Sequence, residues 1–410
     1  MAIAALFNSK DFRVTSVIGL AHGSSHFFQW VLPPLFPLLK EGFDVSWAQL
    51  GFMVSLFFVT SSVSQFVSGF LVDRIGARAI LLSGVFLLAG GIFACSFAPN
   101  IYVMYVFAVL MGLGNGVFHP CDFAIMNENI HERRLGYAFS VHGIGGNIGW
   151  ALSPVVSYAL ASQLGWRAAV MILGGIGLCL FLMLLSQYEF IKTTPVAHKA
   201  KAAALGDAPT SLASQSWWQR ATILCFLFML LQSFSGGGIQ SFTTSVLHND
   251  FQLTLAWASF ALSAYFVGST AGVLVGGVAA SKNISHAKIA VASLSAAGGI
   301  ALLLLWVIPL LGSTAFLAFS VMGFAVGVAA PSRDLIVRSV APQGATGRVY
   351  GFVYSGMDIG STLAPFTFGL LLDHGLNSWV YPVIGGVFLL AMFTVFNVAG
   401  TSGIRGFGKK

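Results

Sequence analysis

Long apolar runs repeat along the chain, separated by short charged or turn-forming stretches. A membrane helix needs about 20 predominantly apolar residues, and the runs have about this length. They start near Val14, Trp47, Ala79, Ile101, Gly136 and Trp166, and again near Ala221, Leu255, Ile289, Ser313, Val349 and Ser378. The pattern predicts twelve transmembrane helices in two groups of six.

One long polar segment, residues 188–218, separates the two groups. Its prolines and charged residues are typical of a linker. We therefore predict a six-helix bundle at 1–187, a cytoplasmic linker at 188–218 and a second six-helix bundle at 219–410.

The composition excludes an ordinary soluble protein. Only 8% of the 410 residues are charged and 57% are hydrophobic, whereas soluble domains carry about 25% charged residues. The twelve predicted helices leave no room for a separate catalytic domain. We find no Walker motif, no H-E-x-x-H and no G-x-S-x-G, so we expect no enzyme activity and no cofactor, and an ion gradient as the energy source.

The formal charge of +7 has an explanation that needs no nucleic acid. With the N-terminus in the cytoplasm, almost all Lys and Arg residues fall on the cytoplasmic side, and only Lys40 and Arg167 fall outside. We expect a multi-pass protein of the bacterial inner membrane with both termini cytoplasmic. Its expected partners are a small-molecule substrate, protons and the lipid bilayer, without nucleic acid, and we expect a monomer.

The two groups of helices share an internal repeat. An offset of 211 aligns residues 111–154 with 322–365 without a gap, and twelve of the 44 positions are identical. They include Gly112/Gly323, Gly149/Gly360 and Pro154/Pro365. Glycines at fixed spacing set the close packing of membrane helices. The repeat predicts an all-α membrane protein with two pseudo-symmetric six-helix halves, the architecture of a secondary transporter.

The loop after the second run, Gly69-Phe-Leu-Val-Asp73-Arg74-Ile-Gly76-Ala-Arg78, resembles the G-x-x-x-D-R-x-G-x-R signature of the major facilitator superfamily. The resemblance implies the major facilitator fold and gating roles for Asp73, Arg74 and Arg78.

Three shorter motifs look like the fosmidomycin-resistance branch of that superfamily: residues 22–29, Phe118-His119-Pro120, and Gly145-Gly146-Asn147 with Pro154. This branch resembles proton-driven drug exporters. It implies a carboxylate in the first span and a Glu after His-Pro, where this chain has His26 and Cys121. The acid is displaced to Asp122.

Polar residues inside the first span form a stripe. His22, His26 and Gln29 follow at i, i+4 and i+7 and so lie on one helical face. We predict that they contact substrate in a cavity. His26 is also a candidate for proton coupling, because histidine titrates near neutral pH, and a metal site at His22 and His26 is a further alternative. We predict no bound metal.

Asp122 and His119 share a face of the fourth span, three residues apart. The resemblance implies that Asp122 pairs with Arg74 in a cytoplasmic latch beside Asp73. Asp122 is also a candidate proton site. The two roles are compatible, and we count His119 among the gating residues.

In the second half, Arg333 is a candidate for anion binding or for a gate, because its guanidinium suits carboxylate or phosphate. Asp334 and Arg338, four residues apart, are expected to neutralise each other as gating residues. Asp358 is a candidate proton acceptor or a partner of Arg333. Further predicted substrate contacts are His142, Asn147, Gln232, Gln240 and Tyr354.

These residues predict a proton-coupled transporter that moves a small organic solute, anionic or amphipathic, by alternating access. Export is favoured by the family resemblance. The alternatives are import of organic anions with protons, favoured by the histidine and arginine content, and transport of a metal or metal chelate through His22 and His26. An uncoupled facilitator and a membrane receptor remain open.

Overall fold

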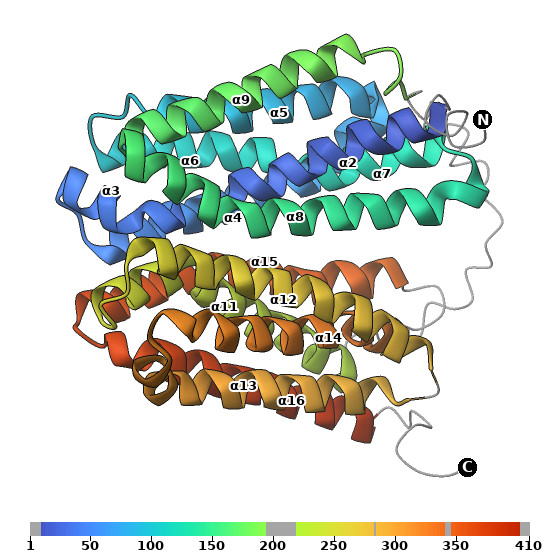
Figure 1. Cartoon of the computed structure of the whole chain (residues 1–410). Helices are drawn as coiled ribbons and strands as arrows, with labels where there is room; N and C mark the ends of the chain where they lie inside the picture. Colours follow the sequence, from blue (N-terminus) through green and yellow to red (C-terminus); the bar gives the residue numbers. More distant parts are fainter. Residues whose placement is uncertain (1–9, 194–218, 283, 341–345, 402–410) are drawn as a thin grey trace, which may run out of the picture. The chain divides into compact units, whose positions relative to one another are not determined.

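The computed structural model describes residues 10–193, 219–282, 284–340 and 346–401, and in these ranges every regular element is a helix. Contacts divide the chain into two units, Met1–Val45 with Leu56–Ala208 and Ser46–Ser55 with Pro209–Lys410 (Figure 1). Most of the predicted linker lies outside the described residues. The domain limits 1–187, 188–218 and 219–410 stay predictions.

The helices of the first half follow the predicted runs, but two of the runs are broken. The first run divides where Pro33 and Pro34, which lack a backbone N–H, follow α2, and the fourth divides at Gly116 and Val117. The elements are α2 (Lys10–Gln29), η1 (Pro33–Leu35), α3 (Phe36–Phe43), α4 (Trp47–Ile75), α5 (Ala77–Cys95), α6 (Ile101–Asn115), α7 (Phe118–Asn129), α8 (Glu132–Leu164) and α9 (Trp166–Ser186).

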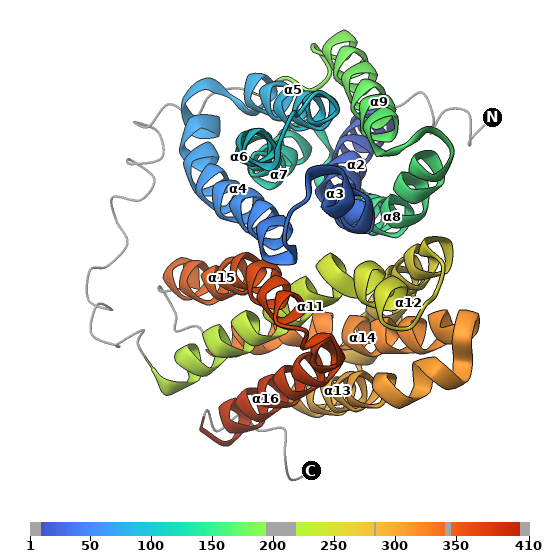
Figure 2. The same ribbon diagram turned by 90° about the vertical axis from the view of Figure 1, so that its left-hand side faces the viewer.

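Glycines bring α2 and α8 into backbone contact. A Cβ atom added at Gly23 would lie 2.9 Å from the carbonyl oxygen of Gly145, and one added at Gly145 would lie 2.7 Å from that of Gly19. Any side chain larger than the hydrogen atom of glycine would push the two helices apart at these positions. α2 also contacts α7, and Figure 2 shows α2 beside both helices. The residues of α2, α7 and α8 therefore meet inside the first unit.

The second half contains six long helices in the described residues. α12 packs along α14, α11 along α15 and α13 along α16. The elements are α11 (Arg220–Asn249), α12 (Leu255–Ser281), α13 (His286–Leu311), η3 (Gly312–Ala315), α14 (Phe316–Val340), α15 (Thr346–Asp373), η4 (Asn377–Trp379) and α16 (Val380–Thr401).

Glycines of the internal repeat occupy equivalent helix crossings. A Cβ atom at Gly112 would collide with the carbonyl oxygen of Phe57 on α4, the second span, and one at Gly323 with that of Tyr265 on α12, the eighth. The fourth span thus packs on the second as the tenth packs on the eighth. This correspondence is what a duplicated six-helix unit predicts.

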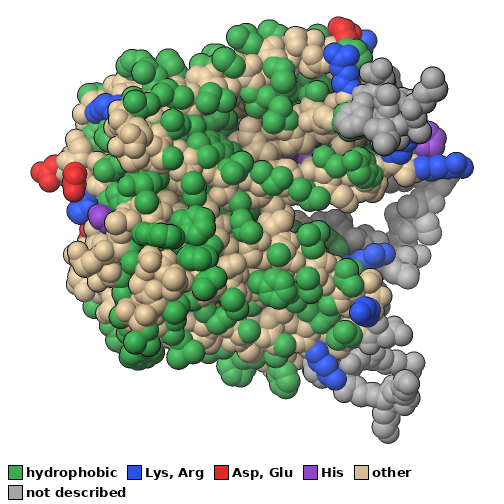
Figure 3. Space-filling model, in the orientation of Figure 1, with side chains coloured by type: hydrophobic (Ala, Val, Ile, Leu, Met, Phe, Trp, Pro, Cys, Tyr) green, Lys and Arg blue, Asp and Glu red, His purple; other side chains and the backbone are tan. Residues whose placement is uncertain are grey.

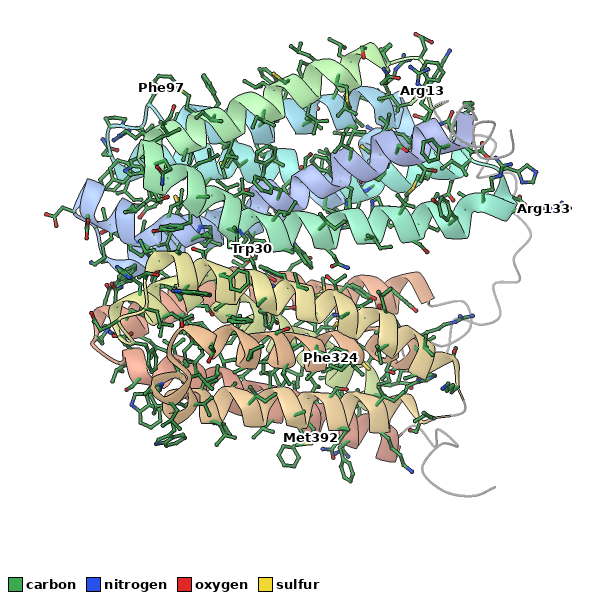
Figure 4. All side chains as sticks on the ribbon, in the orientation of Figure 1. Arg13, Trp30, Phe97, Arg133, Phe324 and Met392 are labelled. Atoms are coloured by element: carbon green, nitrogen blue, oxygen red, sulfur yellow. The ribbon has the colours of Figure 1, made fainter. Side chains whose placement is uncertain are left out.

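The surface of each unit suits a lipid environment. Hydrophobic side chains are spread over the face that Figure 3 shows, and the charged side chains gather at its two ends. Among the described residues, eight helical stretches are long and apolar enough to cross a membrane. Three predicted spans are not among these stretches because they carry more polar residues. They are the first span, formed by α2 and α3, the fifth span, α8, and the eleventh span, α15. Arg13 and Arg133 lie at one end of the first unit and Phe97 at the other (Figure 4). The chain is an all-α, multi-pass membrane protein.

Candidate functional site

Four histidines and one aspartate meet inside the first unit. His22 and His26 come from α2, His119 and Asp122 from α7, and His142 from α8; we call these five residues the histidine cluster. The ring of His22 is central, because its centroid lies 3.5 Å from that of His142, 4.3 Å from that of His26 and 5.0 Å from that of His119.

Asp122 is fully buried at the inner side of the cluster. Nε2 of His142 and Oδ2 of Asp122 form a hydrogen bond of 3.0 Å. Nδ1 of His22 lies 3.2 Å from the same oxygen, but the geometry is not that of a hydrogen bond, and both this nitrogen and Oδ1 of Asp122 lack a partner among the described residues. Buried polar atoms without partners are costly in a fold. They indicate a site that another group completes.

Local helix geometry brings the cluster together. Residues four apart on α2 and three apart on α7 lie on one face of each helix, which aligns His22 with His26 and His119 with Asp122. The glycine contacts between α2 and α8 then bring His142 against His22. Accessibility is graded, since His119 is exposed, His26 is half-buried and His22 is buried.

An aromatic side chain supports the outer end of the cluster. The ring of Trp150 stacks on that of His26, with centroids 4.4 Å apart and an interplanar angle of 13°. Its Nε1 donates a hydrogen bond of 3.0 Å to Oε1 of Gln29. Gln29, a predicted substrate contact, thus orients the indole ring that lies on His26. Trp150 was not predicted from the sequence.

The cluster offers donor atoms for three kinds of chemistry. Its imidazoles and carboxylate can hold or pass a proton, and they can hydrogen-bond a polar solute. They can also bind a metal, because the donor atoms of His22, His26 and His119 lie within 4.8 Å of one another, and so do those of His22, Asp122 and His142.

The structure does not form the latch expected at Asp122. In the described part of the chain no ion pair joins Asp122 to Arg74; the partner of Asp122 is His142, and Arg74 is exposed at the end of α4 beside half-buried Asp73. Asp122 is fully buried between α2 and α8, so its carboxylate faces imidazoles instead of a loop arginine. The prediction of this pair was wrong.

Arg78 holds the segment that follows α9. Its guanidinium lies 3.3 Å above the ring centroid of Tyr188, and Nη1 donates a hydrogen bond of 3.2 Å to the carbonyl oxygen of that residue. Nη1 also lies 3.8 Å from Oε1 of Glu189. Arg78 therefore ties α5 to the start of the predicted linker. Its gating role stays a prediction.

In the second unit, Asp334 pairs with a different arginine from the one expected. Nε of Arg333 donates a hydrogen bond of 2.9 Å to Oδ1 of Asp334, and the hydroxyl of Tyr354 donates one of 3.0 Å to the same atom. Both residues are described, and no ion pair links Asp334 to Arg338. The prediction of an Asp334–Arg338 pair was wrong, because the adjacent guanidinium and the α15 hydroxyl take this carboxylate.

The other predicted site residues are Asn147, Gln232 and Gln240, given as substrate contacts, and Asp358, given as a proton acceptor. Asn147 is half-buried on α8, one residue after Gly146. Gln232 is buried and Gln240 half-buried on α11, and Asp358 is half-buried on α15, one turn after Tyr354. Their roles stay predictions.

Ionisable groups buried inside a bundle of membrane helices mark functional sites such as substrate and ion pathways. The model of the Major Facilitator Superfamily matches residues 18–256 and 225–402. The chain belongs to this superfamily. It is therefore a transporter of small molecules and not an enzyme.

Individual relatives agree with this assignment. The fosmidomycin resistance protein of Escherichia coli K12 is 24% identical over 394 residues, which are 94% of this chain and 93% of that protein. The multidrug resistance protein B homolog of Mycobacterium tuberculosis is 29% identical over 155 residues, 38% of this chain and 27% of the relative.

A solved structure has the same fold. The bacterial homolog of the human lysosomal transporter Spinster, in an inward-facing and occupied conformation, superimposes with a TM-score of 0.71 at 15% identity. The match covers 96% of this chain and 97% of the other.

Proposed function

We propose that the chain is a proton-coupled secondary transporter that exports a small organic solute by alternating access. The histidine cluster carries this proposal. Ionisable residues inside membrane spans are costly, so such residues are retained for function. Here a fully buried aspartate is combined with four imidazoles in one place. We assign solute binding in the first unit to this cluster.

The breaks in the helices support this assignment. Transporters bind solutes where membrane helices are discontinuous, because free backbone groups become available there. α2 ends four residues before η1, and α6 ends three residues before α7. His26 lies in the last turn of α2 and His119 in the first turn of α7. Both broken spans therefore contribute ligand groups close to their breaks.

Proton coupling is assigned to Asp358. This half-buried carboxylate lies within a predicted span and outside the histidine cluster, and an acid in a membrane helix is a functional candidate by default. The proton-carrying roles predicted for His26 and Asp122 stay predictions. Without motifs for nucleotide hydrolysis, an ion gradient is the available energy source.

Export is the direction that the relatives favour, because two of them are named for drug resistance. Import of an organic anion was favoured by the histidine and arginine content, in which Arg333 was the candidate for anion binding. The carboxylate of Asp334, 2.9 Å from Nε of Arg333, offsets that charge. We therefore keep export, and we place the anionic or amphipathic solute at the cluster.

The orientation follows from the charges. The end of the first unit that carries Arg13 and Arg133 is assigned to the cytoplasm by the positive-inside rule. Both termini are then cytoplasmic, and we place the chain in the bacterial inner membrane as a monomer.

A second candidate function, transport of a metal or its chelate, is favoured by the donor atoms of the cluster.

Transport by purified protein in sealed vesicles tests the proposal. The vesicles have an acidic interior, and the solutes are fosmidomycin, nicotinate and ethidium. An antiporter accumulates its solute inside while protons leave, and a protonophore abolishes the accumulation. Asp358→Asn loses this accumulation but keeps solute exchange at equal pH. The control Asp250→Asn, which changes a carboxylate after the end of α11, behaves as wild type.

Two results contradict the proposal. Uptake that is equally fast with and without the gradient identifies an uncoupled facilitator. A solute that shifts the melting temperature of the protein but never crosses the vesicle wall identifies a receptor.

A further inference from the structure

We propose that the histidine cluster binds a divalent transition-metal ion of the zinc type through His22, His26 and His119, and that this ion is the cargo, either free or in a small organic chelate. The cargo role deepens the proposed transport function and rests on it. Metal binding by the three imidazoles stands on the geometry alone.

The donor atoms already lie close to metal-binding distance. Zinc binds histidine nitrogens at about 2.0–2.1 Å in tetrahedral geometry, which places neighbouring donor atoms about 3.3 Å apart. The donor atoms of His22, His26 and His119 all lie within 4.8 Å of one another. Rotations of the three side chains that shorten these separations would bring the three nitrogens onto one ion.

Asp122 occupies the position of a supporting carboxylate. Histidines that bind a metal usually donate their other ring N–H to a carboxylate, which fixes the ring and its tautomer. Oδ2 of Asp122 lies 3.2 Å from Nδ1 of His22, which leaves Nε2 of His22 for the metal. His142 holds the same carboxylate through its hydrogen bond of 3.0 Å. Nδ1 of His22 has no hydrogen bond among the described residues. With a metal on Nε2, the Nδ1–H group would donate to Asp122 after a rotation of the ring.

A glycine allows the two imidazole rings to lie against α8. Gly146 faces the cluster from α8, and a Cβ atom there would lie 2.6 Å from Nδ1 of His26 and 3.1 Å from Cδ2 of His22. Any larger residue would displace the two rings. An ion exchanges water for imidazole along a path of increasing burial, from exposed His119 through half-buried His26 to buried His22.

Ligand type defines the cation. Imidazole nitrogens suit Zn²⁺, Co²⁺, Ni²⁺ and Cu²⁺, whereas Mg²⁺ and Ca²⁺ require oxygen ligands. Three imidazoles leave a fourth tetrahedral position open. Water fills that position on a free ion and a chelator atom fills it in a chelate, so both sources present the same chemistry to the cluster.

Binding is measured on the full-length protein in detergent, purified without a polyhistidine tag. Calorimetry with Zn²⁺ and the visible absorption of bound Co²⁺ report the site, and Mg²⁺ is the negative control. We expect one Zn²⁺ per chain, nitrogen-type Co²⁺ absorption and no Mg²⁺ binding. Absence of Zn²⁺ and Co²⁺ binding by wild type at millimolar concentration overturns the proposal.

Variants locate the ion. His119→Ala removes an exposed ligand, so folding is unaffected and the Zn²⁺ affinity falls at least about tenfold. Asp122→Asn weakens binding about 10–100-fold, as expected for a supporting carboxylate. His374→Ala, which changes an exposed histidine on the segment after α15, is the matched control and binds as wild type. If His119→Ala binds Zn²⁺ as tightly as wild type, the proposed ligand set is wrong.

A vesicle assay distinguishes free zinc from chelated zinc as the cargo. It also distinguishes a failure of the proposed metal site from a failure of the proposed transport function. Zinc is offered as the free ion and as its citrate chelate, and the form that accumulates identifies the cargo. Zinc binding with the variant pattern above, but no movement of either form or of any organic solute, supports the metal site and contradicts the transport function. Gradient-driven movement of an organic solute by a protein that does not bind zinc supports the transport function and overturns the metal site.

Discussion

A Cβ atom on Gly146 of α8 would lie 2.6 Å from Nδ1 of His26 on α2, closer than such atoms approach in folded proteins. The glycine is therefore what allows the imidazole to lie against α8. This contact, with the hydrogen bond between His142 and Asp122, connects three helices at the histidine cluster.

We expect Gly146→Ala to weaken ligand binding at the cluster without unfolding the protein. The added methyl group displaces the rings of His26 and His22, so the affinities for Zn²⁺ and fosmidomycin fall at least about tenfold by calorimetry. Gly143→Ala is the matched control on the same helix, because nothing lies within 4 Å of its Cβ position. The control binds as wild type and gains up to about 1 kcal/mol of helix stability. Equal loss in both variants contradicts this account.

Trp150 is expected to orient His26 for its ligand. Trp150→Phe keeps an aromatic ring on the imidazole but loses the hydrogen bond to Gln29, and Trp150→Leu loses both. Ligand affinity therefore decreases from wild type to Phe to Leu, while circular dichroism shows the same helix content. An affinity that is unchanged in the Leu variant would show that stacking does not position His26.

Arg78 is expected to stabilise the first unit through Tyr188 more than through Glu189. A cation–π contact at a partly buried site contributes about 1 kcal/mol, whereas a pair to an exposed carboxylate contributes about 0–1 kcal/mol. Arg78→Ala therefore lowers the melting temperature clearly, and Glu189→Gln changes it little, because the side chain of Glu189 is 76% exposed. The opposite order would assign the stabilisation to the ion pair.

The fold was largely predictable from the sequence. Apolar runs predict spans because each must cross the bilayer, and the repeat of glycines predicted the equivalent crossings at Gly112 and Gly323. The break between α6 and α7 was missed, because Gly116 and Val117 interrupt the helix without interrupting the apolar run.

The site was only partly predictable. His22, His26, His119, Asp122 and His142 were all named from the sequence, since polar residues in spans stand out. Their meeting was not predicted, because it depends on where α7 and α8 contact α2. The signal was present in the glycines at spacings of four, Gly19 with Gly23 and Gly145 with Gly149. The pairs expected for Asp122 and Asp334 failed because sequence spacing does not show which neighbour on another helix takes a carboxylate.

We expect glycines of the repeat to matter equally in both units. Gly112→Ala and Gly323→Ala each place a methyl group against a backbone carbonyl, and overpacking of this kind costs about 1–3 kcal/mol. Gly277→Ala, which meets nothing within 4 Å, is the control. Thermal unfolding in detergent measures the three. A loss confined to one unit would show that the two crossings are not equivalent.

The central claim is that the histidine cluster is where the transporter binds its solute. Gradient-driven accumulation in vesicles by wild type, His22→Ala and His374→Ala tests it most directly, with fosmidomycin and zinc citrate as the two solutes. We predict that His22→Ala, reconstituted at equal protein content and with unchanged helix content, loses at least about 90% of the wild-type rate, and that His374→Ala keeps it. Accumulation by His22→Ala at the wild-type rate would contradict the claim.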